Sequence, residues 1–368
     1  MSKRSTSSAQ SAAAPLAPPV IAVRPGGRRR SGAGVTLRDV ATLAGVAPMT
    51  VSRVLREPAS VSDSLREKVD TAVRSLGYVR NRVAGGLAGT RTDAVGVVVP
   101  SMHNAFFSDT LEALAEVIGR HDISLLVSHS GFDLEREADL VESMLSWRPR
   151  ALVLTGVKHA ERVHRMLARA RVPVIEMWEF TRRPIARSIG FSHRAVGRSL
   201  ARHFAGNGYR RLGFGTANVA HDHRAKQVCA GFCDEARRLG LPEVQVVLRE
   251  GRVEMRQGRE MMGELFDSGR RLDGVGFLND VLAVGALFEC NRRGVAVPGD
   301  IGLAGYGGLE MAAQSEPGIT SVAPPSRRIG ELVAAAIIDE SSSGQRKCVD
   351  LGSALIARPS TAPRTVGR

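Results

Sequence analysis

Three side chains near the start of one short helical stretch could contact nucleic acid. The stretch begins at Pro48, and its first two turns carry Thr50, Ser52 and Arg53. Short hydroxyl side chains can reach phosphate oxygens, and an arginine in the major groove can read guanine through the two acceptors of that base. Pro48 and Met49 offer few hydrogen bonds and therefore predict no base preference. By itself, the pattern fits either a DNA-reading helix or a small helical packing module with a solvated face.

One pair of cysteines and one pair of histidines are weaker evidence for a metal site. Cys229 and Cys233 are four residues apart in an apolar run, which favours buried structural thiols over a metal site. His221 and His223 have no further candidate ligand nearby. A G-x-G-x-x-G nucleotide loop is not formed, because Arg211 stands where its third glycine belongs, and no Walker loop occurs. We therefore expect no metal, no other cofactor and no enzymatic activity.

Positive charge is concentrated near the N-terminus of the chain. The 368 residues carry a formal charge of +14. Residues 1–34 hold six basic side chains and no acid, and residues 35–92 hold nine basic and five acidic side chains. This distribution is typical of a protein that meets a polyanion. A general preference for arginine contributes, since only five of the 51 basic residues are lysine. The composition of residues 1–34 predicts a disordered basic extension.

The sequence gives no sign of export or of membrane insertion. No segment approaches the roughly 18 apolar residues that a membrane-spanning helix needs. Ser11–Val23 faintly resembles a signal peptide, but Pro15, Pro18 and Pro19 interrupt its apolar part. Four cysteines are too few for a disulfide scaffold and fit a reducing compartment. We therefore expect a cytoplasmic protein with no membrane partner.

The nucleic-acid candidates need helices to position them, and residues 35–80 predict such helices. Thr36 is a good N-cap for a first helix that ends at Gly45. A second helix is predicted over Pro48–Leu55, and a third over Asp63–Leu76 with one apolar stripe. A second helix that follows the first after a tight turn is a helix-turn-helix arrangement.

Residues 93–368 alternate between strand-like and helical patterns. Such alternation predicts parallel sheets in a doubly wound α/β architecture. The expected strands are too many for one such sheet, so we expect two lobes, with a ligand cleft between them at the carboxyl ends of the strands. The expected strands are Val95–Val99, Leu125–Val127, Ala151–Leu154, Val172–Met177, Ser188–Phe191, Leu212–Gly215, Val244–Leu248, Val275–Leu278 and Ile301–Ala304.

The linker that follows the helices carries the most specific pattern, Leu76-Gly-Tyr-Val-Arg-Asn-Arg-Val-Ala-Gly-Gly-Leu-Ala-Gly-Thr. With the helix-turn-helix, it resembles the LacI/GalR family of bacterial repressors, and the resemblance runs from Val35 nearly to Pro359. It implies two doubly wound parallel-sheet lobes like those of periplasmic sugar-binding proteins, preceded by an all-α headpiece. The domains implied are a headpiece at 35–80, a hinge helix and linker at 81–92, and an effector-binding and dimerisation region at 93–368. Further family-like motifs are Asn104-Ala-Phe-Phe, Asn279-Asp280, Val297–Tyr306 and Ala357–Thr361.

The resemblance also implies roles in DNA binding. Thr36, Thr50 and Ser52 match positions that contact phosphates. Pro48, Met49 and Arg53 match positions of the recognition helix that touch base edges. Asn81 and Arg82 match the hinge helix, and Leu87 matches a leucine that is wedged between the central base pairs of the operator. The sequence departs from the family pattern in the hinge, where Arg80 replaces a proline and Gly85-Gly86 should weaken the helix.

In the effector region the departures from the family pattern are informative. Trp178 stands where an aspartate usually ends the strand, with Glu176 nearby, and Gly307-Gly308 replaces another aspartate. Val228 stands where an arginine is common, which leaves Arg224 and Lys226 as candidate anion ligands. Loss of two carboxylates favours a negatively charged ligand over a neutral sugar. The predicted effector contacts are Ser101, Phe106, Phe107, Glu176, Trp178, Arg224, Lys226, Phe277, Asn279 and Asp280, of which the last two could instead serve as a helix cap.

These departures are similar to the gluconate-utilisation repressors within the family. The similar segments are Glu142–Trp147, Ile175–Trp178, Ser188–Phe191 and Leu282–Cys290. The resemblance implies a homodimeric repressor of sugar-acid catabolism that binds double-stranded operator DNA and is released by gluconate or a related acid. Two alternatives stay open: a sugar-acid sensor or transport protein without a DNA role, and an enzyme acting on sugar acids. Nothing in the residues excludes an activator.

Overall fold

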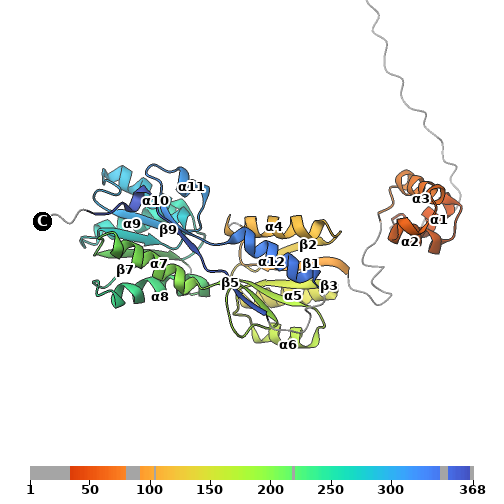
Figure 1. Cartoon of the computed structure of the whole chain (residues 1–368), viewed down its shortest axis with the longest axis horizontal. Coiled ribbons are helices and arrows are strands. Elements are labelled where there is room, and N and C mark those ends of the chain that lie inside the picture. The colour runs from red at the N-terminus through yellow and green to blue at the C-terminus, as the bar shows by residue number, and fades with distance from the viewer. Residues whose placement is uncertain (1–33, 80–91, 103–104, 218–219, 340–346, 365–368) are drawn as a thin grey trace, which may run out of the picture. The chain divides into compact units, whose positions relative to one another are not determined.

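The computed structural model describes residues 34–79, 92–102, 105–217, 220–339 and 347–364 (Figure 1). The chain divides into two compact units, Met1–Asn81 and Arg82–Arg368. The predicted basic extension and most of the predicted hinge segment, with Asn81, Arg82 and Leu87, lie outside the described residues.

The first unit contains the three predicted helices. They are α1 (Leu37–Ala44), α2 (Pro48–Arg56) and α3 (Asp63–Leu76), with a short 3₁₀ turn at Pro58–Ser60. Thr36 caps α1 in a reciprocal capping box with Asp39. Gly45 ends α1 with φ +66°, a left-handed conformation in which glycine carries no steric penalty. The local sequence, Gly45 above all, therefore determines where α1 ends and the turn to α2 begins.

A small apolar core holds these helices together. Its fully buried side chains come from all of them and include Val40, Val51, Val54 and Val69. Val51 and Val54 lie three residues apart, so α2 turns one face to this core and the opposite face to solvent. The packing thus decides which side chains of α2 remain available to a partner.

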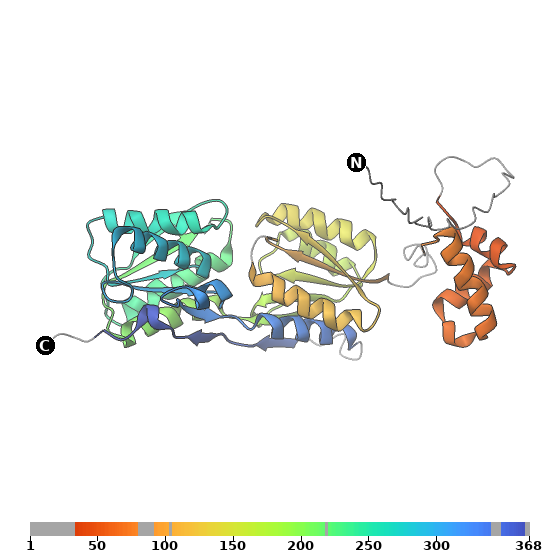
Figure 2. The same cartoon turned by 90° about the horizontal axis from the view of Figure 1, so that it is seen from above.

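The second unit contains two α/β lobes, which confirms the predicted fold class (Figures 1 and 2). The first lobe has a parallel sheet in the order β11-β5-β4-β3-β1-β2. Helices α4 and α12 pack together on one face, and α5 and α6 cover the other. The bounds are β1 (Thr92–Val99), β2 (Ser124–His129), β3 (Pro149–Thr155), β4 (Val174–Glu179), β5 (Arg187–Phe191), β11 (Lys347–Asp350), α4 (Ser108–Gly119), α5 (Leu134–Ser146), α6 (Glu161–Arg169) and α12 (Ser326–Ile338), with a 3₁₀ turn at Ala105–Phe107.

The second lobe repeats this plan. Its sheet has the order β12-β10-β9-β8-β6-β7, in which only the pairing of β10 with β12 is antiparallel. Helices α7 and α8 cover one face, and α9 and α10 cover the other. The bounds are β6 (Leu212–Ala217), β7 (Gln245–Arg249), β8 (Gly274–Phe277), β9 (Gly302–Tyr306), β10 (Thr320–Ala323), β12 (Ala354–Ile356), α7 (His193–Gly206), α8 (His223–Arg238), α9 (Met255–Asp267), α10 (Asp280–Arg293) and α11 (Glu310–Gln314), with a 3₁₀ turn at Pro359–Thr361.

The described chain passes between the lobes after β5, after β10 and after β11. Helix α7, which follows the first crossing, packs closely on α8 through two glycines. A Cβ added at Gly197 would lie 2.0 Å from the carbonyl oxygen of Val228, and one added at Gly231 would lie 2.1 Å from that of Arg194. This close contact fixes the position of α8 on the second lobe. Within the described residues, no helix is long and apolar enough to cross a membrane.

Candidate functional site

The solvent-facing side of α2 carries the predicted DNA-reading residues. Pro48, Met49 and Arg53 are exposed, and 73% of Met49 is accessible to solvent. Thr50 and Ser52 are half-buried beside them. The Met49 side chain is not buried by the folding of the headpiece, so this face of α2 is available to a partner.

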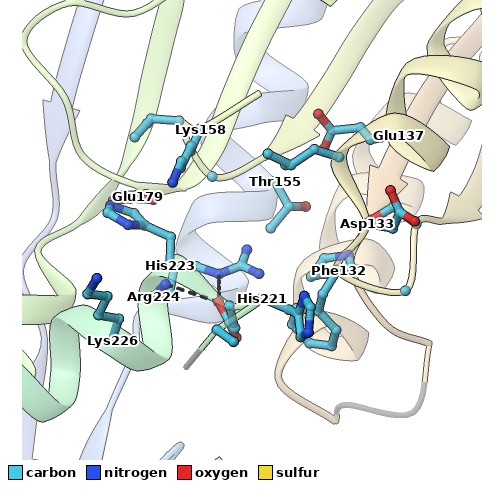
Figure 3. Close-up of a pocket in the computed structure, with 18 residues that line it drawn as sticks. Phe132, Asp133, Glu137, Thr155, Lys158, Glu179, His221, His223, Arg224 and Lys226 are labelled. Atoms are coloured by element: carbon cyan, nitrogen blue, oxygen red, sulfur yellow. Dashed lines mark hydrogen bonds and ion pairs between the residues drawn. The ribbon is translucent and has the colours of Figure 1, made fainter. Parts of the chain in front are cut away.

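The second unit contains a large cavity between its lobes (Figure 3). Its volume is about 710 Å³, which is in the range of small-molecule sites. The first lobe contributes residues at or just beyond the carboxyl ends of β1 to β4, including Pro100, Ser130, Thr155 and Glu179. The second lobe contributes the loop after β6 and the first turn of α8, from Ala220 to Lys226. The cavity therefore lies where parallel α/β sheets usually bind ligands.

Two helices begin at this cavity. Asp133 caps α5 and accepts hydrogen bonds from the amides of Glu135 and Arg136, at 2.8 and 3.1 Å. Asp222 caps α8 and accepts from the amide of Arg224 at 3.0 Å. Both helix N-termini add partial positive charge to the cavity wall.

Arg224 extends from the first turn of α8 between two aromatic rings of the first lobe. Its guanidinium carbon lies 6.0 Å from the ring centroid of Phe107 and 6.0 Å from that of Phe132. Its Nε donates to Oδ1 of Asp222 at 3.1 Å, but its buried Nη1 has no hydrogen-bond partner among the described residues. A buried donor without an acceptor is costly, so this position suits a ligand oxygen.

Two lysines add to this positive charge. Lys158 follows β3 on the first lobe and Lys226 lies in the first turn of α8 on the second, and both line the cavity with exposed side chains. Neither lysine side chain is joined to another described residue by a salt bridge. The cavity thus presents cations from both of its walls.

A smaller apolar pocket of about 50 Å³ adjoins the cavity and shares Phe132, Asp222 and Arg224 with it. Trp178 is central to this pocket, with its ring centroid 4.9 Å from that of Phe107, and its Nε1 donates to Oγ1 of Thr110 at 3.2 Å. The pocket is also lined by Phe106, Phe107, His193, Ala225, Val228, Leu278, Asn279 and Tyr306. A ligand in the cavity therefore has an aromatic wall on one side.

A contact across the cavity joins the lobes. Nε2 of His223 lies 3.6 Å from Oε1 of Glu179, the last residue of β4. Burial raises the pKa of the Glu179 carboxyl, although the nearby charges of His223 and Arg224 lower it. The first turn of α8 is therefore one of the places where the second lobe contacts the first.

Comparison with known proteins identifies the family. Residues 36–81 match the model of bacterial regulatory proteins of the lacI family, and residues 201–361 match a periplasmic binding protein-like domain. The chain is 34% identical over 331 residues to the HTH-type transcriptional regulator GntR of Pseudomonas aeruginosa, which covers 89% of this chain and 95% of that protein. The chain belongs to the LacI family.

Two further comparisons agree. This LacI-family chain is 33% identical over 321 residues to the HTH-type transcriptional regulator GntR of Escherichia coli K12, covering 87% of this chain and 96% of that protein. The crystal structure of a LacI-family transcriptional regulator from Silicibacter pomeroyi has a TM-score of 0.82 and 31% identity, covering 89% of this chain and 99% of that one. The protein is therefore a ligand-regulated, DNA-binding repressor of the LacI family.

Several of the predicted effector contacts come together in this LacI-family cleft. Arg224 and Lys226 line the cavity, and Phe106, Phe107, Trp178 and Asn279 line the adjoining pocket. Asn279 also caps α10 by accepting from the amide of Leu282 at 3.0 Å. The capping alternative is therefore confirmed, and a role in effector binding stays a prediction for the same side chain.

Glu176 does not reach the cavity, which corrects its expected position beside Trp178. Along β4, Ile175 and Met177 belong to one core cluster, whereas Val174 belongs to the cluster on the other face, and Glu176 follows that alternation. Trp178 has φ +72°, which breaks the alternation and turns its ring back to the side of Met177. The carboxylate of Glu176 instead accepts the amide of Ile185 at 2.7 Å.

Three other predicted contacts lie outside both cavities. Phe277 is fully buried in the core between its sheet and α9 and α10. Asp280 is also fully buried, and it accepts from Oγ of Ser321 at 2.6 Å and from the amide of Leu309 at 2.7 Å. Burial raises its pKa to about 6. Ser101 is half-buried just beyond β1 and lines neither cavity.

Other cavity residues were not predicted from the sequence. Lys158, Glu137 and Glu179 are charged residues that follow strands or begin a helix, so the rule that ligands bind beyond carboxyl ends could have found them. The same rule applies to His193 and Tyr306. His193 begins α7 just after β5, where the chain first crosses between the lobes, and Tyr306 is the last residue of β9.

Proposed function

We propose that the effector of this repressor is a sugar acid of the gluconate type, and that the protein binds its operator as a homodimer in the bacterial cytoplasm. The observation that carries the effector assignment is the buried, unpartnered Nη1 of Arg224 at the cavity. A carboxylate would supply the missing acceptor in a charge-assisted hydrogen bond.

The other charges of the cavity suit the rest of such a molecule. Lys158 and Lys226 add positive charge on the two walls, and the polyol chain would find an acceptor in the carboxylate of Glu179. Trp178 and the adjoining phenylalanines offer an apolar surface for the C–H faces of the chain. A neutral sugar would leave the cationic side of the cavity without a partner.

The similarities support the same effector. Both curated relatives described above are regulators named GntR. The segments 142–147, 175–178, 188–191 and 282–290 resemble gluconate-utilisation repressors. These two observations are independent of the charges in the cavity.

We propose that the effector acts by changing how the two lobes meet. An acid held by Arg224 of the second lobe and Lys158 of the first would favour one relative orientation of the lobes. In a homodimer, that change would move the two first lobes apart or together, and so would alter the hinge segments and the headpieces on their half-sites. A coupling free energy of about 1–3 kcal/mol would be enough for a useful switch.

The first test is a thermal shift of the purified protein with gluconate, 6-phosphogluconate, 2-ketogluconate, ribose, galactose and purines. A ligand that binds only the folded state raises the melting midpoint. We expect a shift with sugar acids and none with ribose, galactose or purines. A shift with a neutral sugar or a purine alone would overturn the effector assignment.

The second test uses a matched pair of variants on α8. Arg224→Gln should weaken gluconate binding by about tenfold or more, because it removes a charged hydrogen bond to the carboxylate. Arg237→Gln, at the exposed far end of the same helix, should leave the affinity unchanged. Release of fluorescent operator DNA by gluconate then shows whether binding is coupled to DNA. Equal affinities in both variants would contradict the role of Arg224.

A further inference from the structure

A buried ion-pair cluster lies behind the first-lobe wall of the cavity. His159, between β3 and α6, has a fully buried side chain, and its Nδ1 donates to Oε1 of Glu137 on α5 at 2.6 Å. Its Nε2 lies 3.5 Å from Oε1 of Glu176. Glu176 is in turn held by the amide of Ile185 at 2.7 Å. One histidine thus lies between two carboxylates from different elements.

The charge of this cluster follows from its contacts. Burial alone would lower the pKa of His159, but the hydrogen bond to Glu137 and the charges of Glu137 and Glu176 outweigh it and raise the pKa to about 9. A cationic His159 between two carboxylates leaves the cluster with one net negative charge. Glu137 and Glu176 share that charge, but only Glu137 lines the cavity.

Glu137 has one carboxylate oxygen left for a ligand. Its side chain is only 7% exposed, and Oε1 is taken by His159. Within the described chain, no residue hydrogen-bonds to Oε2. The side chain lies in the first turn of α5 and faces the cavity across from Arg224 and Lys226 of α8 (Figure 3). A carboxylate buried to this extent with an open acceptor on a cavity is prepared for a donor.

We propose that Glu137, held in place by His159, is a specificity-determining residue that accepts hydrogen bonds from the hydroxyl groups of the bound effector. A ligand hydroxyl can donate to the open Oε2, whereas a carboxylate ligand would be repelled by Glu137. Glu137 therefore selects for the polyol part of a ligand whose acid part faces α8. This inference rests on the proposed function, because it takes the ligand to be a sugar acid.

The test compares two acids that differ in the length of the polyol chain. D-gluconate and D-glycerate share the carboxylate and the adjacent hydroxyl, but only gluconate reaches far across the cavity. Calorimetric titration gives the ratio of the two Kd values for the wild type, for Glu137→Gln and for the matched control Glu135→Gln. Glu135 is an exposed acid two residues away on the same helix and does not line the cavity.

We expect Glu137→Gln to reduce the preference for gluconate over glycerate by about ten- to a hundredfold, the usual effect of losing a hydrogen bond to a charged group. Glu135→Gln should keep the wild-type ratio. An unchanged ratio in Glu137→Gln, with gluconate still bound, overturns this inference and leaves the proposed function standing. Failure of the wild type to bind any sugar acid overturns both.

A second variant tests whether His159 acts through Glu137. His159→Asn alone should also reduce the preference for gluconate, because it frees the Glu137 carboxylate to move. In the double variant with Glu137→Gln, the His159 substitution should cost little more affinity. Additive losses would assign His159 a separate structural role and overturn its positioning role. Circular dichroism and retained operator binding confirm that each variant is folded.

Discussion

His193 and Trp178 are joined by a hydrogen bond at the first crossing between the lobes, where Nε2 of His193 donates to the carbonyl oxygen of Trp178 at 3.0 Å. A carbonyl oxygen only accepts, so Nε2 carries the proton. Nδ1 is then the acceptor that faces the hydroxyl of Tyr306, 3.5 Å away on the second lobe. His193 thus links the end of β4 in one lobe to the end of β9 in the other.

This link predicts a pH dependence of stability. Burial and the charge of Arg224 lower the pKa of His193 to about 3, from 6.5. A depressed histidine stabilises the fold fully above pH 6.5, and this contribution falls as the pH drops towards 3, because the unfolded chain binds the proton more readily. His193→Gln should therefore reduce the slope of unfolding free energy against pH by about 1.4 kcal/mol per unit between pH 6 and 4.

Urea unfolding at several pH values measures this slope. His121→Gln, an exposed histidine after α4, is the matched control and should keep the wild-type slope. A His193→Gln variant with the wild-type slope would show that His193 is protonated in the folded protein.

Most of the fold could be predicted from the sequence because its elements have strong periodic patterns. Thr36 and Gly45 cap α1, Gly77 ends α3, and β1, β3, β6 and β8 contain continuous apolar runs of the kind that parallel sheets bury on both faces. The strands β10, β11 and β12 were not predicted. They have three or four residues each and include polar or exposed positions, so they are too short and too polar to show a hydrophobic pattern typical of a strand.

The cavity was less predictable, because its lining depends on backbone details without a sequence signature. Period-two alternation puts Glu176 and Trp178 on the same face, but the left-handed backbone of Trp178 separates them. A tryptophan seldom adopts positive φ, so the residue type does not predict this left-handed conformation. Asp280 was expected at the ligand, yet its carboxylate is used to hold the turn after β9.

On the DNA side, Arg53→Ala should weaken operator binding by about 1–3 kcal/mol and relax the preference at one base pair, if Arg53 makes a bidentate contact with guanine. Arg66→Ala, on α3 and paired with Asp63 on its own helix, removes the same charge as a control and should have a smaller effect. Fluorescence anisotropy with operator and single-base variants measures both quantities. Unchanged operator affinity would remove Arg53 from the reading face.

Deleting residues 1–34 should lower non-specific DNA affinity without changing which operator is chosen. The segment carries six basic side chains and no acid, and each contact of a cation with phosphate releases counterions. The slope of log affinity against log salt concentration should therefore become shallower for random-sequence DNA. An equal slope in the full-length and shortened proteins would show that the segment does not contact phosphates.

Trp178→Ala should abolish the response to effector while operator binding persists. Trp178 lies between Phe106, Phe107 and Phe191, with ring centroids 4.9 to 6.3 Å away, so its removal collapses the aromatic wall beside the cavity. Truncating a buried tryptophan costs about 3–5 kcal/mol, and Trp178→Phe is therefore a milder partner that keeps the ring but loses the hydrogen bond to Thr110. Operator release by gluconate should be absent in Trp178→Ala and partial in Trp178→Phe, at temperatures where both variants are folded. A normal release in Trp178→Ala would mean that the effector does not rest on this aromatic wall.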